Sequence, residues 1–321
     1  MKRSKRTDSR PLIGIALGSG SARGWSHIGV LRALAEMGVE PDIVAGCSIG
    51  AFVGAAYVNG NLDAIEEWTR ALDWKDILGF MDVTLLGGGL VQGDRLLQSA
   101  RAFIDSSRFE SLEKPFGTVA TNMETGREVW FREGPLLEGV RASLALPGLF
   151  TPIKVNGEWL VDGGLTNPVP VSLCRAMGAE IVIAVNLNGD IVGKYRSRKK
   201  LRHPARPLEE VNVEFNFMQR LSEQIRNSLS ERRDEWLSGI LGDSEDRPGM
   251  FEVMASSINI MQDRITRSRM AGDPPEILIA PRLAHLALME FDRAADAIAE
   301  GRAAVERMKP VIAHWLDLPA K

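Results

Sequence analysis

An uncharged run near the N-terminus is the feature that most constrains the fold of this chain. It extends from Ile43 to Leu62 and reads IVAGCSIGAFVGAAYVNGNL. A run of this length is close to what a helix needs to cross a bilayer. Four glycines, two asparagines and a serine interrupt it, however, and such residues are typical of turns. We interpret the run as a buried strand, a tight turn and a buried helix in succession.

The segments around this run predict a parallel sheet. Residues 12–17 form a short apolar run that ends in the glycine-rich loop 18–24, and a helical pattern then continues to Gly38. Strand, loop, helix, strand, turn and helix is the order typical of a parallel sheet with helices on both faces. Further elements are predicted along the chain: β-hairpins at 116–133 and 153–164, strands at 180–187 and 276–281, and helices at 169–179, 257–270 and 292–316.

Charge patterning predicts one domain with two polar segments. Residues 1–10 carry five basic side chains and one acid, which indicates a disordered basic arm, and residues 11–321 form a single domain. A charged insertion or flap interrupts this domain at about 188–247. Its basic side chains favour either contact with an anionic lipid surface or a solvated loop. They are Lys194, Arg196, Arg198, Lys199, Lys200, Arg202 and Arg206.

Composition excludes several classes of protein. A net charge of −3 and a pI near 5.9 give no general attraction to nucleic acid. Cys47 and Cys174 cannot form a disulfide framework, and neither lies in a Cys/His cluster that would indicate a zinc site. No apolar signal segment follows the basic N-terminus. We therefore expect a cytoplasmic protein without metal or cofactor, able to contact the inner face of the membrane peripherally.

The first candidate site is Gly46-Cys47-Ser48-Ile49-Gly50, where the predicted strand becomes a helix. The G-x-S-x-G pattern allows a sharp strand-to-helix turn that holds the serine in a strained conformation, and glycines on both sides avoid clashes. Such a turn exposes the hydroxyl at a helix N-terminus, where free N–H groups favour negative charge. A buried turn with a capping serine has the same pattern, so both interpretations stay open on these residues alone.

The second candidate is the loop 18–24, GSGSARG, which also connects a strand to a helix. A dinucleotide-binding loop would need a third glycine where Arg23 stands, and a P-loop would need a Gly-Lys-Ser/Thr sequence. An oxyanion hole needs only N–H donors close to a nucleophile. Because the next strand ends at Ser48, the oxyanion hole is the best of these three interpretations.

The third candidate is Asp162-Gly163-Gly164, at the end of a predicted strand and shortly before Asn167-Pro168. This aspartate has unusual backbone freedom around it, although a simple turn aspartate would look the same. The four histidines offer no clear partner for a serine. None lies in a glycine-containing loop at a strand end, and we interpret each as structural: His27, His203, His285 and His314.

Three motifs taken together, LGSGSARGWSHIGVL, GCSIGA and DGGLTNPVP, resemble the patatin-like phospholipase family. The similarity is closest to small bacterial esterases of that family and to the catalytic domain of neuropathy target esterase. It extends over residues 12–187 and resumes at 257–269 and 274–283. The resemblance implies a three-layer α/β/α fold with a central, mostly parallel sheet.

The resemblance also implies the roles of the site residues. The family uses a serine–aspartate dyad without histidine, which makes Ser48 the nucleophile and Asp162 its base. Its oxyanion loop reads G-G-G-x-[R/K]-G, and Ser19 and Ser21 replace two of these glycines; serine keeps the N–H group that the hole needs. The expected backbone donors are Gly20, Ser21 and Arg23, and the expected elbow and loop glycines are Gly18, Gly24, Gly46, Gly50, Gly163 and Gly164.

From these motifs we expect a serine lipid acyl hydrolase that acts on a phospholipid, a lysophospholipid or another fatty acyl ester through an acyl-enzyme. Two alternatives stay open: a regulatory or scaffold protein on the same fold, and a Ser-His-Asp esterase that uses His285. An aspartate base with an ordinary pKa would be ionised at neutral pH. We therefore expect the acidic limb of the rate profile to lie below the limb that a histidine base would give.

Overall fold

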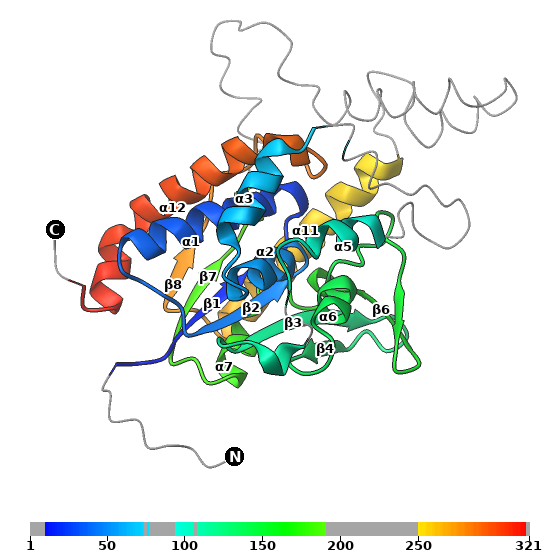
Figure 1. Cartoon of the computed structure of the whole chain (residues 1–321), viewed down its shortest axis with the longest axis horizontal. Helices are drawn as coiled ribbons and strands as arrows, with labels where there is room; N and C mark the ends of the chain where they lie inside the picture. Colours follow the sequence, from blue (N-terminus) through cyan, green and yellow to red (C-terminus); the bar gives the residue numbers. More distant parts are fainter. Residues whose placement is uncertain (1–9, 74–75, 77–93, 106–107, 191–249, 319–321) are drawn as a thin grey trace, which may run out of the picture.

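The computed structural model describes residues 10–73, 76, 94–105, 108–190 and 250–318 (Figure 1). All of the basic arm except Arg10 and nearly all of the charged insertion lie outside these described residues, so the predictions made for them stay predictions. Among the described residues, no helix is both long enough and apolar enough to cross a membrane. The uncharged run from Ile43 forms a buried strand and a buried helix, as predicted.

The strands of the described residues form one eight-stranded sheet in the order β5-β6-β3-β2-β1-β7-β8, and β4 pairs with β3. The ladders that join β3, β2, β1, β7 and β8 are parallel, whereas the pairings of β3 with β4, β3 with β6 and β5 with β6 are antiparallel. Both predicted hairpins are therefore confirmed. The strands are β1 (Ile13–Leu17), β2 (Ile43–Cys47), β3 (Phe116–Asn122), β4 (Glu128–Phe131), β5 (Ile153–Val155), β6 (Glu158–Asp162), β7 (Ile181–Val185) and β8 (Ile277–Ile279).

Helices cover both faces of this sheet, which confirms the predicted three layers (Figure 1). Helices α1, α2 and α12 pack on one face, and α7 packs on the other. The α-helices are α1 (Ser26–Glu36), α2 (Ile49–Val58), α3 (Leu62–Ala71), α5 (Asp94–Ala100), α6 (Leu136–Ser143), α7 (Val171–Ala176), α11 (Met250–Gly272) and α12 (Ala294–Trp315). The short 3-10 helices are η1 (Ser21–Trp25), η2 (Phe109–Ser111), η3 (Gly163–Leu165) and η6 (Phe291–Arg293).

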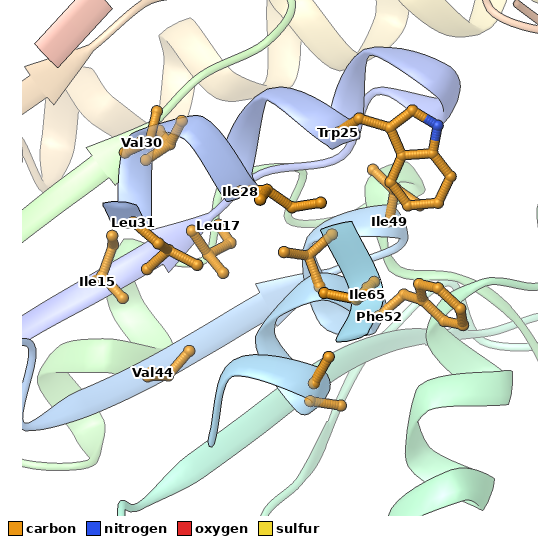
Figure 2. Packing of buried hydrophobic residues seen from close by; sticks show 14 of the residues in the cluster. Ile15, Leu17, Trp25, Ile28, Val30, Leu31, Val44, Ile49, Phe52 and Ile65 are labelled. Atoms are coloured by element: carbon orange, nitrogen blue, oxygen red, sulfur yellow. The ribbon is translucent and has the colours of Figure 1, made fainter. Parts of the chain in front are cut away.

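Side-chain alternation along β1 explains why the two faces differ. Ile13, Ile15 and Leu17 belong to the large core under α1, α2 and α12, whereas Ala16 points to the opposite face, toward α7. Figure 2 shows Ile15 and Leu17 close to Leu31 of α1 within this core. Burial of each such leucine or isoleucine contributes about 1.5–3 kcal/mol to folding. The large side chains of β1 thus form the core on the face of the sheet where α2, the helix after Ser48, packs.

Strand β3 determines how the site is assembled. Thr118 pairs with both β2 and β4, and Ala120 pairs with both β6 and β4, so β2 and β6 must lie along the same edge of β3. Cys47, the last residue of β2, is opposite Val119. Asp162, the last residue of β6, is opposite Ala120. The two strands approach from opposite directions, and their carboxyl ends meet at consecutive residues of β3.

Candidate active site

The turn between β2 and α2 is a strained strand-to-helix elbow, as the sequence predicts. Ser48 has φ 55° and ψ −123°, a conformation that costs a non-glycine residue of the order of 1–3 kcal/mol. A Cβ atom at Gly46 would lie 2.5 Å from the Ala51 Cα atom, and one at Gly50 would lie 2.1 Å from the Leu17 carbonyl oxygen. Only glycine fits at both positions, because the obstacles are backbone atoms.

This packing predicts that Gly50→Ala destabilises the protein by about 3 kcal/mol or more, since neither the helix nor β1 can move without breaking sheet pairing. The measurement is the midpoint of urea or thermal unfolding, followed by circular dichroism. Gly272→Ala is the matched control, because no atom lies within 4 Å of a Cβ atom built there. A Gly50→Ala protein with the wild-type midpoint would contradict the elbow geometry.

The structure brings Ser48 and Asp162 into direct contact. Ser48 Oγ donates a hydrogen bond to Asp162 Oδ2 at 2.5 Å. The other carboxylate oxygen, Oδ1, accepts from the N–H of Gly164 at 2.7 Å, which closes the turn into η3. The main chain of Asp162 is also held on both sides: its N–H donates to the Ala145 carbonyl oxygen at 2.9 Å, and its carbonyl oxygen accepts from Thr121 Oγ1 at 2.9 Å. The carboxylate therefore has little freedom to turn away from the serine.

The environment of Asp162 corrects one expectation from the sequence. The carboxyl is fully buried, and burial raises its pKa above the ordinary 3.8. The hydrogen bonds from Ser48 and Gly164 lower the pKa, but they offset only part of the effect of burial, and the resulting pKa is about 6. An acidic limb near pH 6 lies close to the ordinary pKa of histidine, so this limb does not distinguish the two bases. A base with a pKa near the working pH is well suited to accept and return a proton.

Ser48 itself lies deeper than predicted. The sequence predicted an exposed hydroxyl, yet the residue is only 8% exposed. It lies at a cavity whose lining is apolar apart from Ser48 and Ser21. The wall comes from η1, α2, α3, α5, the loop 144–150 and η6; it includes Trp25, Ile49, Phe52, Trp68, Leu96, Leu144, Phe150 and Phe291. The hydroxyl thus lies at the wall of an apolar cavity.

The glycine-rich loop lies beside this serine because β1 and β2 are neighbouring parallel strands. The N–H groups of Gly18 and Ser19 donate to the carbonyl oxygens of Val185 (3.1 Å) and Pro168 (2.8 Å), so they are used within the fold. The loop then turns at Ser21, which has φ 52° and lines the same cavity as Ser48. Of the three predicted N–H donors, Gly20 precedes η1, and Ser21 and Arg23 belong to it.

The remaining predicted glycines pack tightly around the two turns. Cβ atoms at Gly18, Gly24 and Gly163 would lie 2.6, 2.2 and 2.2 Å from their nearest neighbours, and one at Gly164 would lie 2.3 Å from the amide nitrogen of Gln262. All of the residues predicted for the site therefore lie in or next to the two turns and the loop.

Several polar contacts of the site were not predicted. Ser143 Oγ accepts a hydrogen bond from the N–H of Ser48 at 2.8 Å. Ser19 Oγ, where the family pattern has glycine, donates to Gln262 Oε1 at 3.0 Å. No local pattern marks Ser143 or Gln262 in the sequence, because their partners are distant in the chain. Ser19 was the one visible signal, since it departs from the family's glycine.

The histidines in the described part of the chain do not form a triad with Ser48. His27 is buried beneath the loop, where Nε2 lies 2.8 Å from the Gly18 carbonyl oxygen, and burial lowers its pKa to about 4. His285 and His314 are exposed, whereas the Ser48 hydroxyl points to a buried carboxylate. His203 lies outside the described residues. The buried position of His27 agrees with the structural role expected for it, whereas the structural roles expected for His285 and His314 stay predictions.

The described residues hold no group of three His, Cys, Asp or Glu side chains that could bind a metal ion. Both cysteines are buried and unpaired with each other, and burial raises the pKa of each thiol. Cys47, the residue before Ser48, therefore stays a neutral thiol.

Comparison with known proteins gives the family. Residues 15–175 match the patatin-like phospholipase family. An NTE family protein of Mycobacterium tuberculosis is 33% identical over 328 residues, which cover 93% of this chain and 91% of that protein. Patatin-like phospholipase domain-containing protein 6 of Homo sapiens is 35% identical over 182 residues, or 54% of this chain and 13% of that protein. Lysophospholipase NTE1 of Phaeosphaeria nodorum is 33% identical over 180 residues, or 54% of this chain and 12% of that protein. The chain therefore belongs to the patatin-like phospholipase family.

Proposed function

We propose that this protein is a serine lipid acyl hydrolase, with Ser48 as the nucleophile and Asp162 as its base. The observation that carries the proposal is the 2.5 Å hydrogen bond from Ser48 Oγ to Asp162 Oδ2 at an apolar cavity. A buried carboxylate with a pKa near 6 can take the serine proton at neutral pH, because most of it is then ionised. Membership of a phospholipase family supports a lipid ester as the substrate.

In the proposed reaction, Asp162 accepts the Ser48 proton while Ser48 Oγ bonds to the ester carbonyl carbon. The carbonyl oxygen becomes negatively charged, and the N–H groups of Gly20, Ser21 and Arg23 stabilise it. When the ester bond breaks, the leaving alcohol takes the proton back from Asp162, and the acyl group stays on Ser48. Asp162 then removes a proton from water, the hydroxide attacks the acyl-enzyme, and Ser48 regains its proton as the fatty acid leaves.

The apolar cavity is proposed to hold the acyl chain. Phe52 follows Ser48 by one turn of α2, about 6 Å along the helix axis, so an acyl chain on Ser48 starts beside aromatic carbon rather than water. Trp25 packs against Phe52 with ring centroids 6.3 Å apart, and Figure 2 shows both beside Ile49. A phospholipid, a lysophospholipid or another fatty acyl ester has the required chemistry, and such a substrate brings the protein into contact with a membrane surface.

The proposal predicts that a fluorophosphonate probe labels the folded protein at Ser48 and that the protein releases fatty acid from an acyl ester lipid. Fluorophosphonates react with serines activated by a base, so labelling and fatty acid release both need an activated Ser48 hydroxyl. Peptide mapping locates the label, and Ser48→Ala is the control that should neither label nor hydrolyse. A folded wild-type protein that does neither would contradict the proposal and favour a scaffold role on the same fold.

A further inference from the structure

Helix α11 connects the loops that follow three different strands. It contacts Ser19 after β1, Gly164 and Thr166 after β6, and Asn188 after β7. The residues that make these contacts are Gln262 and Arg269, with Asn259 one turn before Gln262; spacings of three and seven place them on one face of the helix. This helix lies outside the region 15–175 that matches the family.

Gln262 forms the central contact on this face. The residue is 4% exposed, and its Oε1 atom accepts hydrogen bonds from Ser19 Oγ at 3.0 Å and from Asn188 Nδ2 at 2.9 Å. Asn188 is itself fixed, because its N–H donates to Asn186 Oδ1 at 3.0 Å. The amide oxygen therefore joins the glycine-rich loop to the chain after β7.

The nitrogen of the same amide lies against the turn that holds Asp162. A Cβ atom at Gly164 would lie 2.3 Å from Gln262 Nε2, so the absence of a side chain there leaves the space that the amide occupies. The N–H of Gly164 in turn donates to Asp162 Oδ1 at 2.7 Å. One buried side chain thus contacts both the loop of the proposed oxyanion hole and the turn of the proposed base.

A second contact from α11 supports the same loop. Arg23 is 2% exposed; its Nη2 donates to Asn259 Oδ1 at 2.9 Å, and its Nε donates to the Gly20 carbonyl oxygen at 3.2 Å. Gly20 is therefore tied to α11 through Arg23, while Ser19 is tied to it directly through Gln262. Ser19 and Gly20, the two residues before η1, are therefore both held in place by α11.

We propose that Gln262 is a positioning residue, which sets the distance between the oxyanion-hole loop and Asp162. The inference rests on the proposed function. Oxyanion-hole donors act only when they are held at the place where negative charge develops, and a displacement of about 1 Å can cost on the order of 100-fold in rate. This contact depends on Ser19, because the glycine of the family pattern has no hydroxyl to donate at that position.

The first test is Gln262→Met, which keeps a similar length and volume but removes both acceptor contacts. We expect kcat per fluorophosphonate-titrated site to fall about 10- to 100-fold, with KM nearly unchanged, because the lost interaction acts in the transition state. Gln98→Met is the matched control, since Gln98 is exposed on α5. Titration of active sites separates a slower site from a smaller folded fraction.

The second test uses Ser19→Ala, which removes only the hydroxyl and stays informative if Gln262→Met fails to fold. We expect Ser19→Ala to lower kcat per titrated site in the same way. The double variant should be hardly slower than Gln262→Met alone, because both changes break one contact.

Two outcomes would overturn the inference: wild-type kcat per titrated site in Gln262→Met and Ser19→Ala, or losses that simply add in the double variant. A failure of the proposed function looks different, because the wild-type protein would then show no hydrolysis that depends on Ser48.

Discussion

Asp162→Asn is expected to abolish hydrolysis and, at neutral pH, to make the protein more stable. Asparagine keeps the shape of the side chain but cannot accept the Ser48 proton, so the rate should fall on the order of 10⁴-fold. The same change removes a buried charge whose pKa is raised from 3.8 to about 6. That shift corresponds to about 3 kcal/mol of stability that the variant regains. The measurements are hydrolysis of one ester and thermal unfolding at pH 4 and pH 8.

The sign of the stability effect follows from the two protonation equilibria. Below about pH 4 the carboxyl is protonated in both the folded and the unfolded protein, so wild type and variant should be equally stable. As the pH rises from about 4 to about 6, the unfolded chain releases this proton while the folded protein still holds it, so the stability of the wild-type protein falls; the full loss is reached once the pH has passed about 6. Asp105→Asn, a change at an exposed residue, is the control that should show neither effect. An Asp162→Asn protein that keeps the wild-type rate would exclude the aspartate as base.

Ser48→Ala is expected to lose hydrolysis to the same extent, since it removes the proposed nucleophile. The double variant of Ser48 and Asp162 should be hardly slower than either single one, because the two residues act as a unit. Stability should fall by about 1–3 kcal/mol at neutral pH, since the alanine leaves the buried carboxylate without its serine donor. The measurement is the rate of all three variants on the same ester, with unfolding midpoints.

His285→Ala is the companion control for these rates. It should keep most of the activity, because the histidine is exposed and the serine donates to a carboxylate. An inactive His285→Ala protein beside an active Asp162→Asn protein would favour a Ser-His-Asp triad instead.

The sequence predicted the parts of the site that depend on local order. The Ser48 elbow follows from glycines at the junction of an apolar strand and an apolar helix, and their backbone contacts explain why no other residue fits. The nearness of the glycine-rich loop follows as well, because consecutive parallel strands place their carboxyl ends at the same edge. The contact with Asp162 did not follow from spacing. It was implied by the family resemblance, and it depends on pairing between segments far apart in the chain.

Other features depend on the folded surroundings and have no local signal. The raised pKa of Asp162 results from complete burial, which no sequence pattern around DGG indicates. The contact of α1 with α12 is another case. Cβ atoms at Gly29 and Gly301 would lie 2.0 and 2.1 Å from carbonyl oxygens of the opposite helix, so both glycines allow a close helix crossing. The contacts of Gln262 likewise form only when the loops after β1, β6 and β7 have come together in the fold.

The placement of Cys47 and Asp162 opposite consecutive residues of β3 limits which changes in the chain could separate Ser48 from Asp162. The distance between the end of β2, which precedes Ser48, and Asp162 at the end of β6 is set by the backbone repeat of β3, about 3.3 Å per residue. It does not depend on the length of any loop. Insertions between α2 and β3, or between β3 and β6, can therefore lengthen the chain without moving one group relative to the other. A change of register of β2 alone or of β6 alone on β3, in contrast, would move Ser48 relative to Asp162. If Ser48 is the nucleophile, as proposed, its labelling by a fluorophosphonate should appear during refolding only after β3 has paired correctly with both β2 and β6. The rate of labelling would then report when the sheet is complete.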